Sequence, residues 1–341
     1  MSGHKRAPPR TAPMSRYDTP VRTDRRTAPF RDRKVDDIIP DRIPDRPRPY
    51  YKTEYGAAYL GDALELIRHV PDNRINLIMT SPPFALNKKK AYGNVASAQY
   101  VHWFRPFAEE FWRVLREDGS LVVHLGGSWD KGRPTRSTYH FDLLADLCRN
   151  GRESFYFAQD FYWFNPARLP SPAEWVTVRR IRAKDAVDPI WWLAKTPNPK
   201  ADNRRILAPY GKAMQRLLEK GYNSGPRPSG HKISGKFQRD RGGAIPPNLL
   251  VIANTESNSR YLRACRESKI TPHPARYPIE LPLFFIKFLT EEGDIVLDPF
   301  AGSNVTGEAA ERALRRWIAF EKEEQYLTGS AFRFPNATGT L

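Results

Sequence analysis

Cysteine is scarce in this chain: the 341 residues include only Cys148 and Cys265, which cannot form a disulfide framework. No cluster of cysteine and histidine has the spacing of zinc ligands, so we expect no metal site. No apolar run approaches the roughly 20 residues that span a bilayer. The N-terminal region lacks the apolar segment of a secretory signal. These absences exclude disulfide-rich, zinc-stabilised and membrane-spanning classes, and they predict a cytoplasmic protein.

Positive charge is abundant, with a formal net charge of +17. Residues 1–50 contain 13 Lys and Arg against 7 Asp, and residues 165–245 contain 17 Lys and Arg against 6 acidic residues. The rest of the chain is balanced, with 25 residues of each sign. Because phosphate neutralisation dominates nucleic-acid affinity, this distribution predicts two nucleic-acid-facing segments attached to a neutral body.

Composition divides the chain into three parts. Residues 1–50 contain nine prolines and no periodic apolar pattern, which predicts a disordered tail. Residues 51–164 and 246–341 alternate apolar strands with helices, which is typical of an α/β domain with a mostly parallel sheet. Residues 165–245 lose this alternation and are rich in Pro, Gly, Arg and Lys. We therefore interpret them as an insertion rather than a continuation of the sheet.

Within the α/β parts, the pattern of apolar residues predicts the individual strands and helices. Apolar runs that end on polar or glycine residues predict strands at 57–62, 75–80, 120–125, 155–164, 294–298 and 316–320. Apolar residues at helical spacing predict helices at 63–69, 103–116, 141–150, 279–290 and 304–313, with one more at 212–220 inside the insertion.

The segment from Asp298 to Ser303 reads DPFAGS and lies between a predicted strand and a predicted helix. Such a glycine turn lets a ligand approach the backbone at the carboxyl end of the sheet. Glu321, about 20 residues further on at the tip of the next strand, can accept both hydroxyls of a ribose. With only Gly302 and Gly307, the turn matches neither a P-loop nor a dinucleotide fingerprint, so it favours a nucleoside without a pyrophosphate. An ordinary strand–helix turn is an equally frequent reading of this motif alone.

A second motif, Thr80-Ser81-Pro82-Pro83-Phe84, ends another predicted buried strand. Two consecutive prolines remove two N–H donors and stiffen the backbone, leaving carbonyl groups free to accept hydrogen bonds. This loop can hold an amino group between the Ser81 hydroxyl and a proline carbonyl, with Phe84 as a stacking face. Taken alone, Ser-Pro-Pro is more often a plain turn.

The two motifs together, with the basic segment between them, resemble the permuted β-type group of S-adenosylmethionine-dependent DNA amino-methyltransferases. The resemblance extends from about Tyr51 to Phe334 and includes segments 60–62, 165–172 and 273–278. It implies a Rossmann-like class I methyltransferase fold with residues 51–164 and 246–341 as the catalytic domain and residues 165–245 as the target-recognition region.

The resemblance also implies a reaction. Ser followed by Pro-Pro-Phe is typical of the cytosine-N4 branch, so Ser81, Pro82, Pro83 and Phe84 are expected to hold the amine of a flipped-out cytosine. Adenine-N6 methylation is the nearest alternative, and a catalytically silent DNA-binding protein is an alternative from another class. Cytosine-C5 methylation is disfavoured because neither cysteine follows a proline.

For the cofactor, S-adenosyl-L-methionine, the resemblance places Glu321 on the ribose and Asp62 near the adenine edge. The other expected cofactor residues are Thr80, His273, Pro274, Asp298, Pro299, Phe300, Gly302 and Ser303. The expected partners are double-stranded DNA and a cognate restriction endonuclease, with no membrane. The DNA-binding candidates are the basic residues Arg179, Arg180, Arg182, Lys184, Arg204, Arg205, Lys232, Lys236, Arg239 and Arg241.

Overall fold

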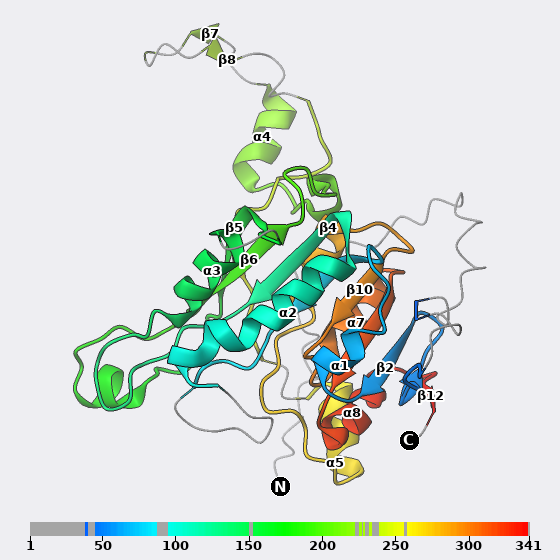
Figure 1. Cartoon of the computed structure of the whole chain (residues 1–341). Coiled ribbons are helices and arrows are strands. Elements are labelled where there is room, and N and C mark those ends of the chain that lie inside the picture. Colours follow the sequence, from blue (N-terminus) through cyan, green and yellow to red (C-terminus); the bar gives the residue numbers. More distant parts are fainter. Residues whose placement is uncertain are drawn as a thin grey trace, which may run out of the picture. The chain divides into compact units, whose positions relative to one another are not determined.

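A computed structural model describes residues 38–39, 45–86, 95–149, 153–221, 225–226, 228, 232–233, 239–255 and 258–339. The chain divides into two compact units, the smaller of which contains Ile206–Pro246 and the larger Arg26–Arg205 with Pro247–Leu341. The larger unit is built around one sheet, which Figure 1 shows with helices α1 and α2 lying over it.

The sheet has ten strands in the order β12-β1-β2-β11-β10-β3-β4-β6-β5-β9. Its five central strands, from β2 to β4, are parallel, and antiparallel pairs flank them on both sides. This arrangement confirms the predicted α/β class. In sheet order the strands are β12 (Thr338–Gly339), β1 (Tyr51–Lys52), β2 (Gly56–Leu60), β11 (Arg316–Glu321), β10 (Ile295–Asp298), β3 (Ile75–Thr80), β4 (Leu115–His124), β6 (Val187–Ala194), β5 (Tyr156–Phe164) and β9 (Leu249–Val251).

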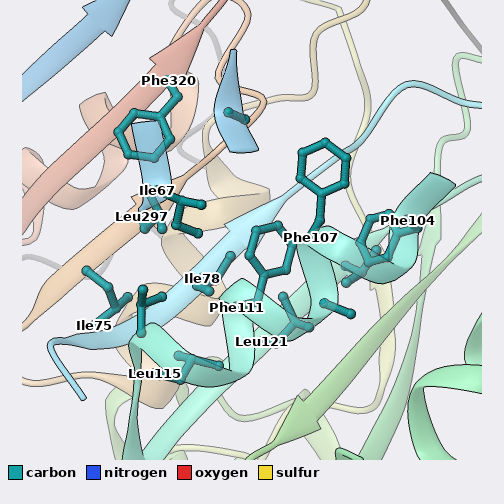
Figure 2. Packing of buried hydrophobic residues seen from close by; sticks show 14 of the residues in the cluster. Ile67, Ile75, Ile78, Phe104, Phe107, Phe111, Leu115, Leu121, Leu297 and Phe320 are labelled. Atoms are coloured by element: carbon teal, nitrogen blue, oxygen red, sulfur yellow. The ribbon is translucent and has the colours of Figure 1, made fainter. Parts of the chain in front are cut away.

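Helices α1 (Ala63–Ile67), α2 (Tyr100–Val114) and α3 (Tyr139–Arg149) share one hydrophobic core with the sheet. In α2, Phe104, Phe107 and Phe111 recur at helical spacing and are buried. Figure 2 shows Phe107 and Phe111 beside strand β3, with Ile78 beneath them. The aromatic face of α2 therefore fixes the helix over the centre of the sheet.

The opposite face of the sheet is covered by α6 (Glu280–Leu289) and α7 (Val305–Arg312). The remaining helical segments of the larger unit are α5 (Arg260–Glu267), α8 (Glu324–Ser330), η3 (Ser97–Gln99), η4 (Glu174–Val178), η5 (Asn203–Ile206, which crosses into the smaller unit) and η7 (Ala331–Arg333). None of the helices in the described ranges is long and apolar enough to cross a membrane.

Strand β6 corrects the prediction that the whole of 165–245 lies outside the sheet. Val187–Ala194 runs between β4 and β5 and pairs with both. Trp191 is buried in the core shared with α1–α3, whereas Trp192 lies 5.1 Å from Phe288 of α6 between ring centroids. Because both faces of β6 are covered from Ile190 onward, Ile190–Ala194 is a continuous apolar run without the alternation of a half-exposed strand.

The predicted disordered tail is also wrong in part. Ile38 and Ile39 are each only 1% exposed and belong to the hydrophobic core, and the Tyr50 N–H donates to the Ala58 carbonyl at 2.8 Å. Two adjacent isoleucines bury enough apolar surface to anchor a short segment of an otherwise polar stretch. Residues 1–37 and 40–44 of the predicted tail lie outside the described residues.

In the smaller unit, the helix predicted at 212–220 is α4 (Lys212–Lys220). Ala208 and Ala244 pair as an isolated bridge, which closes the segment between them. The short strands β7 (Gly225–Pro226) and β8 (Lys232–Ile233) pair with each other. All side chains of α4 are exposed or half-buried.

Candidate functional site

The predicted site residues follow the carboxyl ends of neighbouring strands. Glu321 ends β11, Asp298 ends β10 and Thr80 ends β3, and these strands are adjacent and parallel. From β10 the chain crosses to β11 on one side, and from β3 it crosses to β4 on the other. Ligands of open α/β sheets bind at such a switch point, which here lies between β10 and β3.

Asp298 joins the two strands across this switch point. Its Oδ1 accepts hydrogen bonds from the Thr80 hydroxyl at 3.0 Å and from the Phe300 N–H at 3.1 Å. Its Oδ2 accepts from Thr306 Oγ1 at 2.6 Å and from the Tyr277 hydroxyl at 3.4 Å. Burial raises the pKa of Asp298 to about 6, although these hydrogen bonds act in the opposite direction. Both carboxylate oxygens thus brace the turn.

Glu321 holds the glycine turn. Its Oε2 accepts a hydrogen bond from the Gly302 N–H at 2.8 Å, and its Oε1 accepts from the Glu323 N–H at 2.9 Å. Gly302 has φ of +52°, and a Cβ at this position would lie 3.0–3.1 Å from three ring atoms of His273. The turn therefore requires glycine for its backbone conformation and for the approach of the imidazole.

His273 reaches the turn from a distant part of the chain. Its Nδ1 donates to the Ala275 carbonyl at 2.6 Å, and its ring lies edge-on to Tyr326, with 4.7 Å between centroids. Burial lowers the pKa of His273 to about 4, so the imidazole is neutral at pH 7. The adjacent Pro274 is exposed. The structure thus brings the predicted 273–274 segment to the glycine turn.

The other predicted cofactor residues differ in their surroundings. The Phe300 ring is half-buried against Trp103 and Phe107 of α2, and Pro299 is buried. The carbonyl and hydroxyl oxygens of Ser303 accept hydrogen bonds from Arg333.

Asp62 follows β2 and is exposed at the same edge of the sheet as Glu321. Its Oδ1 accepts from the Leu64 N–H at 2.8 Å, which caps α1. The N–H of Gly61, next to it, donates to the Glu321 carbonyl at 3.0 Å. Asp62 therefore caps a helix and lies beside the tip of β11 as well.

The Ser-Pro-Pro-Phe loop is held by contacts with Tyr100 and Gly126. The Tyr100 hydroxyl donates to the Pro83 carbonyl at 2.8 Å, whereas no described residue donates to the carbonyl of the buried Pro82. The Phe84 ring packs at Gly126, where an added Cβ would lie 2.6 Å from the ring. The Pro82 carbonyl and the Ser81 hydroxyl thus remain the acceptors that this loop can present to an amine.

Sequence reasoning missed three residues behind this loop. His124, at the end of β4, has its Nδ1 3.1 Å from Ser81 Oγ. Its Nε2 faces Asp188 Oδ2 at 3.6 Å, and Asp188 Oδ1 accepts a hydrogen bond from Arg168 at 2.9 Å. Burial would raise the pKa of Asp188, but His124 and Arg168 together lower it to about 2. His124 is a polar residue near the carboxyl end of the strand predicted at 120–125, and this was a detectable signal because Thr80 and Asp298 were identified in the same way.

The predicted DNA-binding residues fall into separate groups. Arg179, Arg180, Arg182 and Lys184 are exposed within one segment, 165–186, between β5 and β6. Arg204 and Arg205 form ion pairs within the protein, Arg204 with an aspartate and Arg205 with a glutamate. In the smaller unit, Arg239 and Arg241 are exposed, whereas the Lys232 side chain and all of Lys236 lie outside the described residues.

No cluster of three or more metal-ligating side chains occurs within the described ranges. Cys265 is buried and Cys148 is half-buried, and burial raises the pKa of both thiols.

Comparison with known proteins covers both motifs. Residues 75–332 match the family described as DNA methylase. The chain is 51% identical over 290 residues to the type II methyltransferase M.PvuII of Proteus hauseri, covering 84% of this chain and 86% of that protein. It is 47% identical over 291 residues to the type II methyltransferase M.BglI of Bacillus subtilis, covering 78% and 82% respectively. The solved structure of the PvuII cytosine-N4-specific DNA methyltransferase superposes with a TM-score of 0.69 at 45% identity, over 84% of this chain and 89% of that one.

Proposed function

Because the chain belongs to the DNA methylase family, we propose that it transfers a methyl group from S-adenosyl-L-methionine to N4 of a cytosine in double-stranded DNA. The names of its relatives support this proposal, since the similar solved structure is described as cytosine-N4-specific. Both named type II relatives support a role in restriction and modification, with a cognate endonuclease as a functional partner. The predicted methyltransferase fold is confirmed by the likeness to that structure.

One observation carries the proposal: the amine loop and the glycine turn meet at the switch point between β10 and β3. The hydrogen bond of 3.0 Å between Thr80 and Asp298 joins the residue before Ser81 to the residue that begins the turn. A cofactor bound at the glycine turn and an amine held by the loop would therefore be neighbours, as direct transfer of a methyl group between them requires.

The residues of the turn fit an S-adenosyl-L-methionine molecule. Gly302 lets the His273 imidazole approach the turn, and the Glu321 carboxylate, held by the Gly302 and Glu323 N–H groups, can accept further hydrogen bonds from ribose hydroxyls. Phe300 offers an aromatic face for the nucleoside, and His273 with Pro274 would line the methionine side. When bound, this cofactor supplies an electrophilic methyl group on a sulfonium.

The protein would prepare the amine for transfer. An exocyclic amine within a duplex cannot reach the loop, so the cytosine must leave the base stack. The Ser81 hydroxyl and the Pro82 carbonyl would accept the two N4 hydrogens and draw the nitrogen lone pair out of the ring. Phe84 would hold the base by stacking, and Pro83 keeps the loop rigid.

DNA binding is assigned to the basic segments. The exposed residues Arg179, Arg180, Arg182 and Lys184 can contact phosphates, and most such contacts position DNA without reading its sequence. Arg204, Arg205, Lys232, Lys236, Arg239 and Arg241 remain candidates, and residues 165–245 remain the proposed target-recognition region.

Product analysis tests the proposed function. Unmethylated DNA is incubated with the protein and S-adenosyl-L-methionine, digested to nucleosides and examined by mass spectrometry. N4-methylcytosine is the expected product, and N6-methyladenine would show that the loop accepts the other base. Absence of any methylated base together with absence of cofactor binding would leave only a DNA-binding protein.

Ser81→Ala tests the role of the loop. We expect methyl transfer to fall by about 100-fold or more, while the Kd for S-adenosyl-L-methionine stays unchanged. Ser268→Ala, at the exposed end of α5, is the matched control. Equal rates in the two variants would overturn the role of the Ser81 hydroxyl.

A further inference from the structure

A row of polar side chains leads away from the amine loop into the protein. Ser81 Oγ and His124 Nδ1 are 3.1 Å apart, His124 Nε2 and Asp188 Oδ2 are 3.6 Å apart, and Arg168 donates to Asp188 at 2.9 Å. The row therefore begins at the hydroxyl assigned to the target amine and ends on a guanidinium group.

The row exists because β4 and β6 are antiparallel. The carboxyl end of β4, at His124, lies beside the beginning of β6, where Asp188 is the second residue. Arg168 comes from the segment that precedes β6. Three stretches of chain, each remote from Ser81 in sequence, thus converge behind it.

His124 is enclosed by these groups. It is only 5% exposed, and its ring lies among Phe84, Trp163 and Tyr277 at centroid distances of 5.5, 5.4 and 6.2 Å. Its Nε2 is buried and has no hydrogen-bond partner among the described residues, so Asp188 at 3.6 Å is the polar group that it faces.

The surroundings select one tautomer of neutral His124. Asp188 is ionised at pH 7, because its pKa is lowered to about 2. A lone pair on Nε2 would repel this carboxylate, so the proton of the neutral imidazole belongs on Nε2. Nδ1 is then an acceptor, and the hydroxyl proton of Ser81 points toward it.

We propose that His124 receives, through the Ser81 hydroxyl, the proton that the target amine must lose. This inference rests on the proposed methyl transfer. When N4 bonds to the methyl carbon, the electrons of the carbon–sulfur bond stay on sulfur and N4 becomes cationic. Ser81 Oγ then takes a proton from N4 while its own proton moves to His124 Nδ1, and the imidazolium releases one proton to solvent after the methylated base has left.

Asp188 and Arg168 are positioning residues in this scheme. The Asp188 carboxylate stabilises the imidazolium that forms, and the Arg168 guanidinium keeps the carboxylate in place. The titratable or charged groups that face His124 are Asp188 from β6, Tyr277 from the 273–278 segment and, through Asp188, Arg168. Because only a neutral imidazole can accept this proton, we expect methyl transfer to rise with pH.

The experiment combines kinetics with a measurement on the protein alone. His124→Asn and Asp188→Asn are compared with His140→Gln, which changes another buried histidine, on α3. Single-turnover methyl transfer is followed against pH, and the Kd values for S-adenosyl-L-methionine and DNA are measured separately. Imidazole ¹⁵N NMR of the free protein reports the tautomer of His124.

We expect His124→Asn to lower the transfer rate by about 100-fold and to remove the rising limb of the pH profile, with both Kd values within about twofold. The NMR signals should show His124 protonated on Nε2, and Asp188→Asn should lower the transfer rate. His140→Gln should retain the wild-type profile.

Two results would overturn the proposal: an unchanged pH profile in His124→Asn, or an Nδ1-protonated His124 in the free protein. Asp188→Asn keeps the test decisive if His124→Asn fails to fold, since loss of the carboxylate must then lower the transfer rate while both Kd values stay unchanged. If wild-type protein methylates no DNA, the proposed function itself fails, and this outcome is distinct from an active wild type with an unaffected His124→Asn variant.

Discussion

Replacing Gly302 with alanine tests the geometry of the glycine turn. The left-handed φ of +52° costs a residue with a Cβ about 1–2 kcal/mol. The new Cβ would also press on the His273 ring at 3.0–3.1 Å, and the hydrogen bond to Ala275 with the contact to Tyr326 prevents the ring from moving away. Overpacking of this kind costs about 1–3 kcal/mol, so we expect a total loss of about 2–5 kcal/mol.

Gly132 supplies the matched control. Its φ of +71° is also left-handed, but no atom lies within 4 Å of an added Cβ. Gly132→Ala should therefore lose only the backbone part, about 1–2 kcal/mol. Urea unfolding followed by tryptophan fluorescence measures both variants.

A double-mutant cycle separates the two parts of the Gly302→Ala effect. In a His273→Ala background the steric part should disappear, which leaves Gly302→Ala as costly as Gly132→Ala. The reasoning fails if Gly302→Ala costs no more than the control in the wild-type background. It also fails if removing the imidazole changes nothing.

Four further outcomes are expected. Glu321→Ala should weaken cofactor binding by calorimetry at least tenfold and leave salt-sensitive DNA binding intact; unchanged cofactor affinity would remove Glu321 from the ribose. The pKa of Asp188 is lowered from 3.8 to about 2, so its ionised form stabilises the fold above about pH 4 by about 2–3 kcal/mol, and this is lost as pH falls from about 4 to about 2. The free energy of unfolding measured in urea should therefore fall more steeply over that pH interval in wild type than in Asp188→Asn. The same pH dependence in both proteins would contradict the assignment. Lys195→Met should lower the free energy of unfolding by about 1–3 kcal/mol, because the buried ammonium donates to an amide and a carbonyl oxygen that would lose their partner, and a neutral result would contradict this. Gly56→Ala should destabilise by about 3 kcal/mol or more, since its Cβ would lie 2.1–2.4 Å from the buried Trp317 indole, and a stable variant seen by thermal melting would refute the contact.

The parallel strands could be predicted because each is an apolar run with a distinct ending. The strand predicted at 75–80 is β3 (Ile75–Thr80), and the polar residues that end β3, β10 and β11 lie at the switch point, as expected from parallel strands. The glycine turn could be identified because Gly302 is the residue type that a left-handed turn needs.

Long-range pairing explains what could not be predicted. Asp188 lies in a stretch rich in Pro and Arg, and its place beside His124 depends on β6 entering the sheet antiparallel to β4. The core positions of Ile38 and Ile39 depend on tertiary contacts that no local pattern encodes. The composition of a segment predicts its average character, but it does not identify the few residues of that segment that pack into the core.

Segment 165–186 leaves and rejoins the sheet at a single place. Phe164 of β5 and Val187 of β6 are partners in the same ladder, and the Asn165 N–H donates to the Ala186 carbonyl at 2.9 Å. The segment is therefore a connection between two paired strands, and its length can change while the register of β5 and β6 is preserved. Residues 169–186 can therefore be exchanged as one piece without removing Arg168 or Asp188, and a descendant with a new sequence there would keep the row of side chains behind Ser81.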